Sequence, residues 1–479
     1  MSTRRPNILF ILSDDHAAHA IGTYGNPWVR TPHLDRLAAE GVRLDNCHCT
    51  NAICTPSRAT IVTGQYGHVT GVTCWQPLDN RRPVQVQKLL GAAGYRNAIF
   101  GKWHLDLPYA GYGVPGPIPG EPAGFDDWAT LDGQGAYHDP VFRTPHGLRT
   151  TTGYTTDVIT DLALEWLERE DRCDRPFHLC VHHKAPHSPW TPAERHRDWY
   201  TDVDLPVPPT FNDDYATRPA AEAAARVIGI GRPDGVQMAG DPPPGLDAQA
   251  LKHWWYQRFM KEYLRCVAAI DDSVGRLLSK LDELGVADDT LVIYTSDQGY
   301  FLGDHGWADK RFMYEPSLRM PFILRYPAEI PAGTTRPEIL TNLDFAPTLL
   351  DYAGIAAPSE MQGVSGRAML RGSPPADWQQ SFYYRYWDHG GRGVCAHYGV
   401  RTATHKLVYF HPSALTWTGK VDVPPCLTPY WELFDLETDP HELHNRHGDP
   451  ALAGVQTSLR AELVRLQRKY GDQPLHQEG

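Results

Sequence analysis

The sequence predicts an α/β fold, in which a doubly wound, mostly parallel sheet is followed by a smaller antiparallel sheet and a terminal helix. Up to about residue 375, short apolar runs alternate with helical stretches, as expected of strands that helices cover on both faces. Beyond that point, short strand-like runs precede one last helical stretch. We therefore divide the chain into a large α/β domain, residues 1–375, and a C-terminal subdomain, residues 376–479.

Four continuous apolar runs are each followed at once by a polar cluster. They predict buried strands over residues 6–13, 95–100, 177–181 and 291–296. The polar clusters begin at Asp14, Gly101, His182 and Asp297. Because the carboxyl ends of parallel strands form the ligand crevice of an open α/β sheet, we expect the four clusters to converge at one edge.

The other elements follow from periodicity and from helix stop signals. Helices are predicted over residues 57–63, 155–170, 246–285 and 450–470, and strands of the subdomain over residues 382–386, 398–402 and 406–410. Residues 105–124, rich in proline and glycine, are predicted to border the pocket. Residues 205–245 are expected to be irregular, either as a surface loop or as a cover over the site.

The converging clusters supply oxygen ligands for a metal ion. Asp14, Asp15 and Asp297 offer carboxylates, and Gln298 offers an amide oxygen. Such a set favours Ca²⁺ or Mg²⁺ over zinc, and Ca²⁺ is preferred because it accepts six or more ligands in irregular geometry. Taken alone, Asp14 and Asp15 are equally well explained as a helix cap or a turn after a strand.

The run Cys54-Thr55-Pro56-Ser57-Arg58 has the pattern C-x-P-x-R and resembles the signature of type I, formylglycine-dependent sulfatases of the alkaline phosphatase superfamily. The resemblance covers nearly the whole chain, through residues 5–9, 14–16, 24–27, 31–37, 54–64, 101–104, 186–189, 296–299 and 431–440. It implies an alkaline-phosphatase-like fold and a sulfuric ester hydrolase. It also implies that a formylglycine-generating enzyme binds the chain transiently and oxidises Cys54 to an aldehyde.

The chemistry of sulfate release agrees with a modified cysteine. A sulfated thiol has no easy way to release its sulfate. A geminal diol, the hydrate of the aldehyde, attacks sulfur through one oxygen and expels sulfate by collapsing through the other. The resemblance also implies that an oxygen of modified Cys54 joins the metal ligands. A helix predicted to begin just after Cys54 favours an anion beside it.

The same resemblance implies roles for five further residues. Arg58 and Lys102 resemble the cations that hold the oxygens of the modified cysteine, and His104 resembles the base that helps to break down the sulfated diol. His187 and Lys310 resemble the sulfate-binding pair near the leaving-group oxygen. Cations placed where charge develops give the largest rate benefit. Both histidines are expected to titrate near neutrality, as acid–base work requires.

The substrate is expected to be a small anionic sulfate ester, either a sulfated saccharide or an aryl sulfate. Residues 296–306, 309–315 and 397–402 look most like glycan sulfatases that act on 6-sulfated N-acetylglucosamine, and Gln298 supports this grouping because many relatives carry Asn or His there. Candidate specificity residues, each of which is alternatively a packing residue, are Trp103, Trp307, Arg311, Arg385 and His397.

Two rival functions stay open. Phosphonate monoester hydrolases and phosphodiesterases of the same superfamily also carry a formylglycine and need similar cations, although Gln298 in place of a His favours sulfate. The second rival is an unmodified protein that only binds sulfated ligands. The complete set of candidate catalytic residues disfavours this second reading.

Composition sets further limits. The formal net charge of −12 offers no field that attracts nucleic acid or an anionic membrane, so neither is an expected partner. The N-terminus lacks the apolar segment of a signal peptide, and no stretch is long enough to span a bilayer. Together with nine scattered cysteines, this predicts a cytoplasmic protein with reduced thiols; the sequence makes no prediction of oligomeric state.

Several other histidines and cysteines are expected to lie outside the site. Packing or surface roles are favoured for His16, His19, His33, His48, His182 and His183. Cys47 and Cys49 are expected to be buried free thiols, because the spacing around them is not that of a zinc module.

Overall fold

The computed structural model describes residues 5–106, 122–169, 175–231, 240–388, 391–412 and 428–473. Its centre is a ten-stranded sheet with the order β11-β2-β10-β9-β1-β8-β4-β5-β6-β7. The strands are β1 (Asn7–Ser13), β2 (Val42–Leu44), β4 (Arg96–Gly101), β5 (Asp127–Leu131), β6 (Val141–Thr144), β7 (Gly147–Thr150), β8 (Phe177–His182), β9 (Thr290–Ser296), β10 (Phe322–Arg325) and β11 (Thr334–Arg336). The five central strands β9, β1, β8, β4 and β5 are parallel, which confirms the predicted mostly parallel sheet and its four buried strands.

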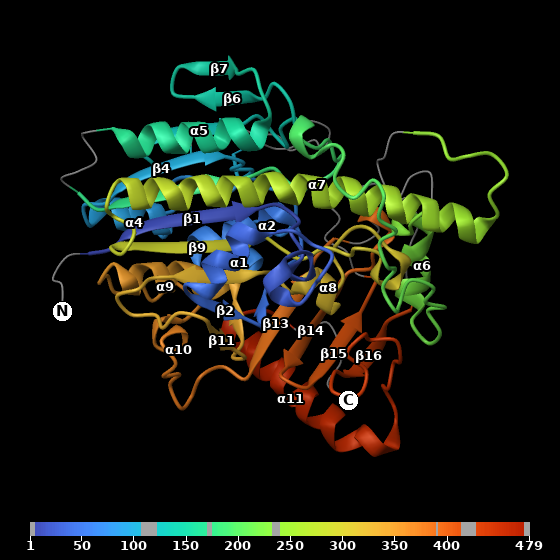
Figure 1. The fold of residues 1–479 in the computed structure, drawn as a ribbon. Coiled ribbons are helices and arrows are strands. Elements are labelled where there is room, and N and C mark those ends of the chain that lie inside the picture. Colours follow the sequence, from blue (N-terminus) through green and yellow to red (C-terminus); the bar gives the residue numbers. More distant parts are fainter. Residues whose placement is uncertain are drawn as a thin grey trace.

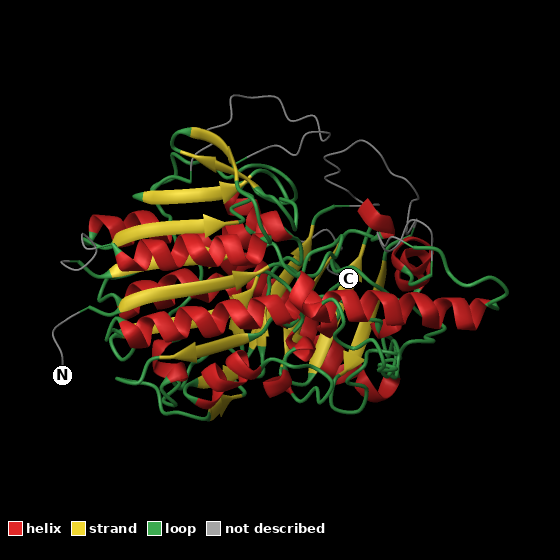
Figure 2. Cartoon of the chain, turned by 45° about the horizontal axis from the view of Figure 1, so that its top comes forward, coloured by secondary structure: helices red, strands yellow, loops and turns green. Residues whose placement is uncertain are grey.

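Helices cover both faces of this sheet (Figures 1 and 2). The α-helices that the structure describes before residue 376 are α1 (Pro32–Ala39), α2 (Cys54–Thr63), α3 (Gly67–Thr70), α4 (Val86–Ala92), α5 (Thr155–Glu168), α6 (Pro219–Ile228), α7 (Ala248–Glu283), α8 (Glu315–Leu318), α9 (Phe345–Tyr352) and α10 (Arg367–Leu370). Side chains of β1 alternate between two cores: Ile8 and Phe10 pack with α2, α4 and α9, whereas Leu9 and Ile11 pack with α1, α5 and α7. A strand buried on both faces has no polar side, which explains its continuous apolar run.

The predicted helices are present, with shifted ends. α2 begins at Cys54 itself, whereas the prediction placed Cys54 just before the helix, and it ends at Gly64 in the left-handed conformation (φ 63°). In α7, the Asp247 carboxylate caps the first turn by accepting from the Ala250 N–H at 2.8 Å. Gly285, at φ 65°, supports the turn after that helix, because only glycine adopts this conformation without strain.

The expectation of an irregular segment over residues 205–245 is wrong in part. Helix α6 lies inside it, begins with Pro219 in its first turn, and buries Ala220, Ala221 and Ala224. Proline suits the first turn of a helix, and small alanines allow close packing. Most of the predicted insertion at 105–124 lies outside the described residues.

The C-terminal region forms a second, antiparallel sheet with the order β13-β14-β15-β16. Its strands are β13 (Ser381–Tyr386), β14 (His397–Thr402), β15 (His405–Phe410) and β16 (Tyr430–Asp435), and helix α11 (Ala453–Tyr470) packs on it through Leu459, Leu463 and Leu466. A separate pair, β3 (Cys47–His48) and β12 (Leu340–Thr341), lies near α2. The predicted small sheet with a terminal helix is confirmed, with β16 as an additional strand.

None of the helices in the described part of the chain combines the length and apolar character needed to cross a membrane. Among the residues that the structure describes, six cysteines are buried free thiols, namely Cys47, Cys49, Cys54, Cys74, Cys180 and Cys266. The expectation for Cys47 and Cys49 is therefore confirmed. Cys395 is disulfide-bonded, so the expectation that all thiols are reduced is wrong at this position.

Candidate active site

The four predicted polar clusters meet at the carboxyl ends of adjacent parallel strands. Beyond the strand ends their backbones stay in contact: the Asp14 N–H donates to the Ala185 carbonyl at 3.1 Å, and the Lys102 N–H donates to the His182 carbonyl at 2.8 Å. The Asp297 N–H donates to the Ser13 carbonyl at 3.3 Å. The sheet order β9-β1-β8-β4 therefore brings together residues that are far apart in the sequence.

Three buried carboxylates and one amide occupy the middle of this edge. Asp14, Asp297 and Gln298 are fully buried, and Asp15 is 1% exposed with φ 66°, a left-handed conformation that strains a non-glycine residue. The Asp15 N–H donates to Asp297 Oδ1 at 3.2 Å, and Gln298 Nε2 donates to Asp15 Oδ1. Among the described residues, Asp14 Oδ1 and Gln298 Oε1 are buried with no hydrogen-bond partner. Oxygens left in this way fit a hard divalent cation.

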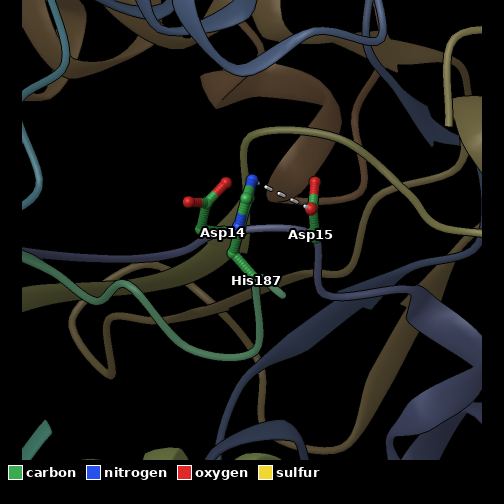
Figure 3. A group of neighbouring side chains, drawn as sticks. All are labelled: Asp14, Asp15 and His187. Atoms are coloured by element: carbon green, nitrogen blue, oxygen red, sulfur yellow. Dashed lines mark ion pairs between the residues drawn. The ribbon is translucent and has the colours of Figure 1, made fainter. Parts of the chain in front are cut away.

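His187 also lies against this cluster. Ligand atoms of Asp14, Asp15 and His187 all lie within 4.8 Å of one another, and His187 Nε2 is 3.7 Å from Asp15 Oδ2 (Figure 3). The sequence interpretation assigned His187 to the sulfate, so the structure adds it to the groups able to approach a cation. A mixed carboxylate and imidazole site accepts several divalent metals.

Burial opposes ionisation of all three carboxylates, but their net pKa shifts differ in direction. It raises the pKa of Asp297 to about 7, and neighbouring Asp14 adds to this effect by repulsion. Burial also raises the pKa of Asp15. Burial opposes ionisation of Asp14 as well, but the positive charges around it, Lys102 first, bring its pKa well below the ordinary value. Three carboxylates in one buried cluster ionise together only where cations compensate them.

Three buried side-chain cations surround the carboxylates. Lys102 Nζ donates to Asp14 Oδ2, and Lys310 Nζ lies 2.5 and 2.6 Å from the two oxygens of Asp15. Arg58 Nε donates to Asp297 Oδ2 at 2.9 Å, and its Nη1 donates to the Lys102 carbonyl at 2.6 Å. The predicted set of Arg58, Lys102 and Lys310 thus lies together, with each cation facing one carboxylate.

Cys54 is the first residue of α2 and is fully buried among these charges. Burial raises the pKa of its thiol, although Lys102 and Lys310 act in the opposite direction, so the unmodified residue is a weak nucleophile. Ser57 fixes the first turn of α2, because its Oγ donates to the Asp297 carbonyl and accepts from Asn342 Nδ2. The N-terminus of α2 is therefore held in a fixed position beside the acidic cluster.

Both candidate histidines are neutral; His104 is buried, and the side chain of His187 is 17% exposed. Burial lowers the pKa of His104 and of His187 well below the ordinary value, with nearby lysines adding to the effect. The expectation that they titrate near neutrality is therefore wrong for this structure. His104, at φ 59°, contacts Thr55 Oγ1 through Nδ1 at 3.2 Å, and His187 Nδ1 donates to the Ser188 carbonyl at 2.6 Å. Nδ1 of each ring therefore has a hydrogen-bonding partner.

The segment that carries Lys310 is held by the C-terminal sheet. Tyr384 of β13 donates to the carbonyl of Arg311, and the Met313 N–H donates to His397 of β14 at 3.0 Å. Further contacts of residues 314 and 315 come from Glu432, Arg401, Lys406 and Glu442. The second sheet therefore positions a candidate catalytic lysine.

Most of the candidate specificity residues pack against protein. Trp103 and Trp307 are 1% and 0% exposed, His397 lies among aromatic rings, and Arg385 pairs with Asp472 and stacks on Trp387. Arg311 is 7% exposed with φ 94°, beside Asp309. Packing roles are also seen for the histidines expected outside the site: His16, His48, His182 and His183 are buried in the cores, and His19 and His33 are partly exposed.

The sequence analysis missed Gln134 and Thr55. Gln134 contacts both Lys102 and His104 from the loop after β5, and Thr55 contacts His104 from the first turn of α2. Thr55 lies inside the C-x-P-x-R pattern, so the sequence already placed it next to the candidate nucleophile Cys54. Gln134 stands between two glycines. This pattern predicts a turn but does not indicate a functional side chain.

Comparison with known proteins identifies the family. A model of the family described as Sulfatase matches residues 6–355. The chain belongs to the sulfatase family. This sulfatase also matches, over residues 303–469, a model described as the C-terminal region of N-sulphoglucosamine sulphohydrolase. Family membership makes it a sulfuric ester hydrolase.

Individual relatives named as sulfatases agree with the family assignment. The sulfatase is 38% identical to N-acetylglucosamine-6-O-sulfatase of Bacteroides thetaiotaomicron, over 98% of this chain and 88% of that protein. It is 27% identical to human N-acetylglucosamine-6-sulfatase, over 81% and 68% of the two chains. A solved structure of a protein with its substrate D-glucosamine-2-N,6-O-disulfate superposes with a TM-score of 0.89 at 36% identity, covering 99% of this chain and 100% of that chain.

The same fold is found in a protein that is named for a different reaction. The phosphonate monoester hydrolase of Agrobacterium radiobacter superposes with a TM-score of 0.75 at 22% identity, over 97% of this chain and 96% of that chain. At this identity the likeness concerns the fold alone. Together with the family match, these structures confirm the alkaline-phosphatase-like fold that the resemblance implies.

Proposed function

We propose that this sulfatase hydrolyses the 6-O-sulfate ester of a glucosamine-type sugar, with Cys54 converted to formylglycine and a divalent cation bound beside it. The observation that carries the mechanism is the burial of Cys54 at the start of α2 within the charge field of Lys102 and Lys310. A buried thiol of raised pKa is a poor nucleophile, whereas an aldehyde hydrate in the same place is not limited by thiol ionisation. The relatives named for N-acetylglucosamine-6-sulfate and glucosamine-2-N,6-O-disulfate support the choice of sugar.

The donor set fits a divalent cation. Asp14, Asp15, Asp297 and Gln298 would hold it, together with an oxygen of modified Cys54, and the unpartnered Asp14 Oδ1 and Gln298 Oε1 are the oxygens best placed to do so. We prefer Ca²⁺ over Mg²⁺ because the donors are many and irregular. When bound, the cation supplies positive charge that stabilises the sulfuryl oxygens in the transition state.

Residues of the chain carry the remaining chemistry. One hydroxyl of the hydrate attacks sulfur and loses its proton, the bond between sulfur and the sugar oxygen breaks, and the sugar oxygen takes up a proton and leaves as a hydroxyl. Arg58 and Lys102 hold the oxygens of the modified residue, while His187 and Lys310 bind the sulfate near the departing oxygen. His104, neutral and buried, then accepts a proton from the second hydroxyl, and the aldehyde re-forms as sulfate leaves.

Peptide mass spectrometry joined to a substrate panel tests the proposal. Trypsin releases Cys54 in the peptide of residues 44–58, in which alkylation marks Cys47 and Cys49 as thiols. The expected result is an aldehyde at residue 54 together with release of sulfate from N-acetylglucosamine-6-sulfate in preference to a phenyl phosphonate monoester. An aldehyde with preference for the phosphonate would overturn the sulfate assignment. Full activity with an unmodified Cys54 thiol would overturn the mechanism.

A further inference from the structure

The side chain of Gln134 contacts two of the candidate catalytic groups at once. Its Oε1 accepts a hydrogen bond from Lys102 Nζ, and its Nε2 lies 3.4 Å from His104 Nε2. Gln134 lies in the loop between β5 and β6, between Gly133 (φ 59°) and Gly135 (φ 68°). Both glycines are in the left-handed region, so the loop needs them in order to turn Gln134 toward the site.

The ammonium group decides which way the Gln134 amide is oriented. A lysine ammonium only donates hydrogen bonds, so the amide oxygen must face Lys102 and the NH₂ group must face His104. His104 Nε2 is then an acceptor and carries no proton. The ring proton lies on Nδ1, which is 3.2 Å from Thr55 Oγ1 and donates to it. The low pKa that burial produces keeps the ring neutral, so this single tautomer is retained.

We propose that Gln134 is a positioning residue that holds His104 as the Nδ1–H tautomer and keeps the Nε2 lone pair free of a proton. This inference rests on the proposed function. In the step it serves, the second hydroxyl of the Cys54-derived hydrate loses its proton to Nε2. The electron pair of that O–H bond forms the aldehyde C=O, the bond from carbon to the sulfate oxygen breaks, and sulfate leaves with its electron pair.

The long contact between Gln134 and His104 suits this role. At 3.4 Å it is a weak hydrogen bond, so a hydroxyl of the hydrate replaces it at Nε2 with little loss. Lys102 keeps the amide oriented while this exchange takes place, because its bond is made to the other end of the same amide. A side chain at position 134 with no hydrogen-bond donor facing His104 would leave the tautomer of His104 undefined.

Two variants distinguish the contact of the Gln134 amide oxygen with Lys102 from the contact of its NH₂ group with His104. Gln134→Glu still accepts from Lys102 but also accepts from His104, so it favours the Nε2–H tautomer and places a proton on the base. Gln134→Leu removes both contacts. Since general base catalysis contributes about 10²-fold or more, we expect Gln134→Glu to lower kcat about 10²-fold with little change in KM. Gln134→Leu should lower kcat about 10-fold and also raise KM, because Lys102 loses one of its two side-chain acceptors among the described residues and keeps only Asp14.

The matched control is Gln380→Leu. Gln380 is an exposed glutamine directly before β13, and its Nε2 donates to the Trp378 carbonyl at 2.8 Å. Its substitution should leave kcat and KM unchanged. Gln134 lies in a loop and is itself partly exposed, so all three variants should fold, with thermal midpoints close to that of the parent protein.

The second measurement does not depend on activity. Histidine side-chain ¹⁵N spectra of the protein, with the His104 signals assigned by their loss in His104→Gln, report the tautomer directly. The parent protein should show a protonated Nδ1 and an unprotonated Nε2, and Gln134→Glu should reverse this pattern. An Nε2–H tautomer in the parent, or an unchanged spectrum and unchanged kcat in Gln134→Glu, would overturn the inference. If the parent protein showed the expected tautomer but no sulfatase activity, the proposed function would be contradicted. The role of Gln134 in holding the tautomer of His104 would not be.

Discussion

The backbone N–H of Met313 donates a hydrogen bond to Nε2 of His397 at 3.0 Å. The other ring nitrogen of His397 donates to the Cys395 carbonyl at 2.7 Å. A backbone N–H can only donate, so His397 is a neutral ring with both nitrogens satisfied, and burial lowers its pKa to about 3. The pair joins the Lys310 segment to the second sheet.

Substitution of His397 should therefore impair activity through Lys310 and not through substrate contact. His397→Leu leaves the Met313 N–H buried without an acceptor, which costs about 1–3 kcal/mol. We expect a lower unfolding midpoint and a reduced kcat, measured by thermal denaturation and by steady-state assay. His146→Leu, an exposed histidine in the turn between β6 and β7, is the control and should change neither. A His397→Leu variant with raised KM alone would instead support the specificity role first considered for this residue.

The Cys54→Ser variant should make a single turnover. A serine oxygen can attack sulfur, but it has no second oxygen through which to expel sulfate, so the sulfated serine should accumulate and appear as an added SO₃ in the mass of the peptide of residues 44–58. Cys54→Ala should lose essentially all turnover while its free energy of unfolding changes by about 1 kcal/mol or less, since only a small buried group is removed. Continuous turnover by Cys54→Ala would contradict the role of Cys54.

Removal of divalent cations should lower both activity and stability. Without a cation, Asp14, Asp15 and Asp297 form a cluster of buried carboxylates. Addition of Ca²⁺ at about 100-fold its dissociation constant should stabilise the folded state by about 2.7 kcal/mol. The measurement is the thermal midpoint after chelation and again after titration with Ca²⁺ or Mg²⁺. Gln298→Leu should weaken the response, whereas Asp157→Asn, at a partly exposed ion pair with Arg195, should retain it. An unchanged midpoint in the parent protein would contradict a cation site here.

Stability should fall as pH rises because of Asp271. Burial raises the pKa of this carboxyl from 3.8 to about 7, although its oxygens accept from the N–H groups of His33 and Leu34 at the start of α1. The folded state therefore binds the proton more tightly than the unfolded state does. The stabilisation is complete below about pH 4 and is lost as pH approaches 7, by at most about 4 kcal/mol.

Asp271→Asn tests this expectation. An amide does not titrate, so the unfolding midpoint of the variant should depend less on pH between 4 and 7 than that of the parent protein. Asp161→Asn, at an exposed ion pair with Arg276, should keep the parent's dependence. Equal slopes for Asp271→Asn and the parent would show that Asp271 is ionised throughout this range.

Local signals in the sequence were sufficient for the four central strands of the large sheet, for three strands of the second sheet and for the helices α2, α5, α7 and α11. Apolar runs such as residues 6–13 have no polar side, and this alone marks a strand buried on both faces. Helix α6 was missed because the prolines and glycines around it favour loops, whereas its alanines are helical once they pack. Tertiary burial overrode local composition there.

By itself, the sequence determined four central strands of the large sheet, the C-x-P-x-R pattern at Cys54, and the convergence of polar clusters that follows from a parallel sheet. Only the tertiary structure decided that His104 and His187 are neutral, that His397 packs against Met313, and that Gln134 joins Lys102 to His104. The partners of Gln134 lie 32 and 30 residues away in the chain. Periodicity and motifs report what a segment does locally, whereas burial and side-chain contact depend on which segments the sheet order places side by side.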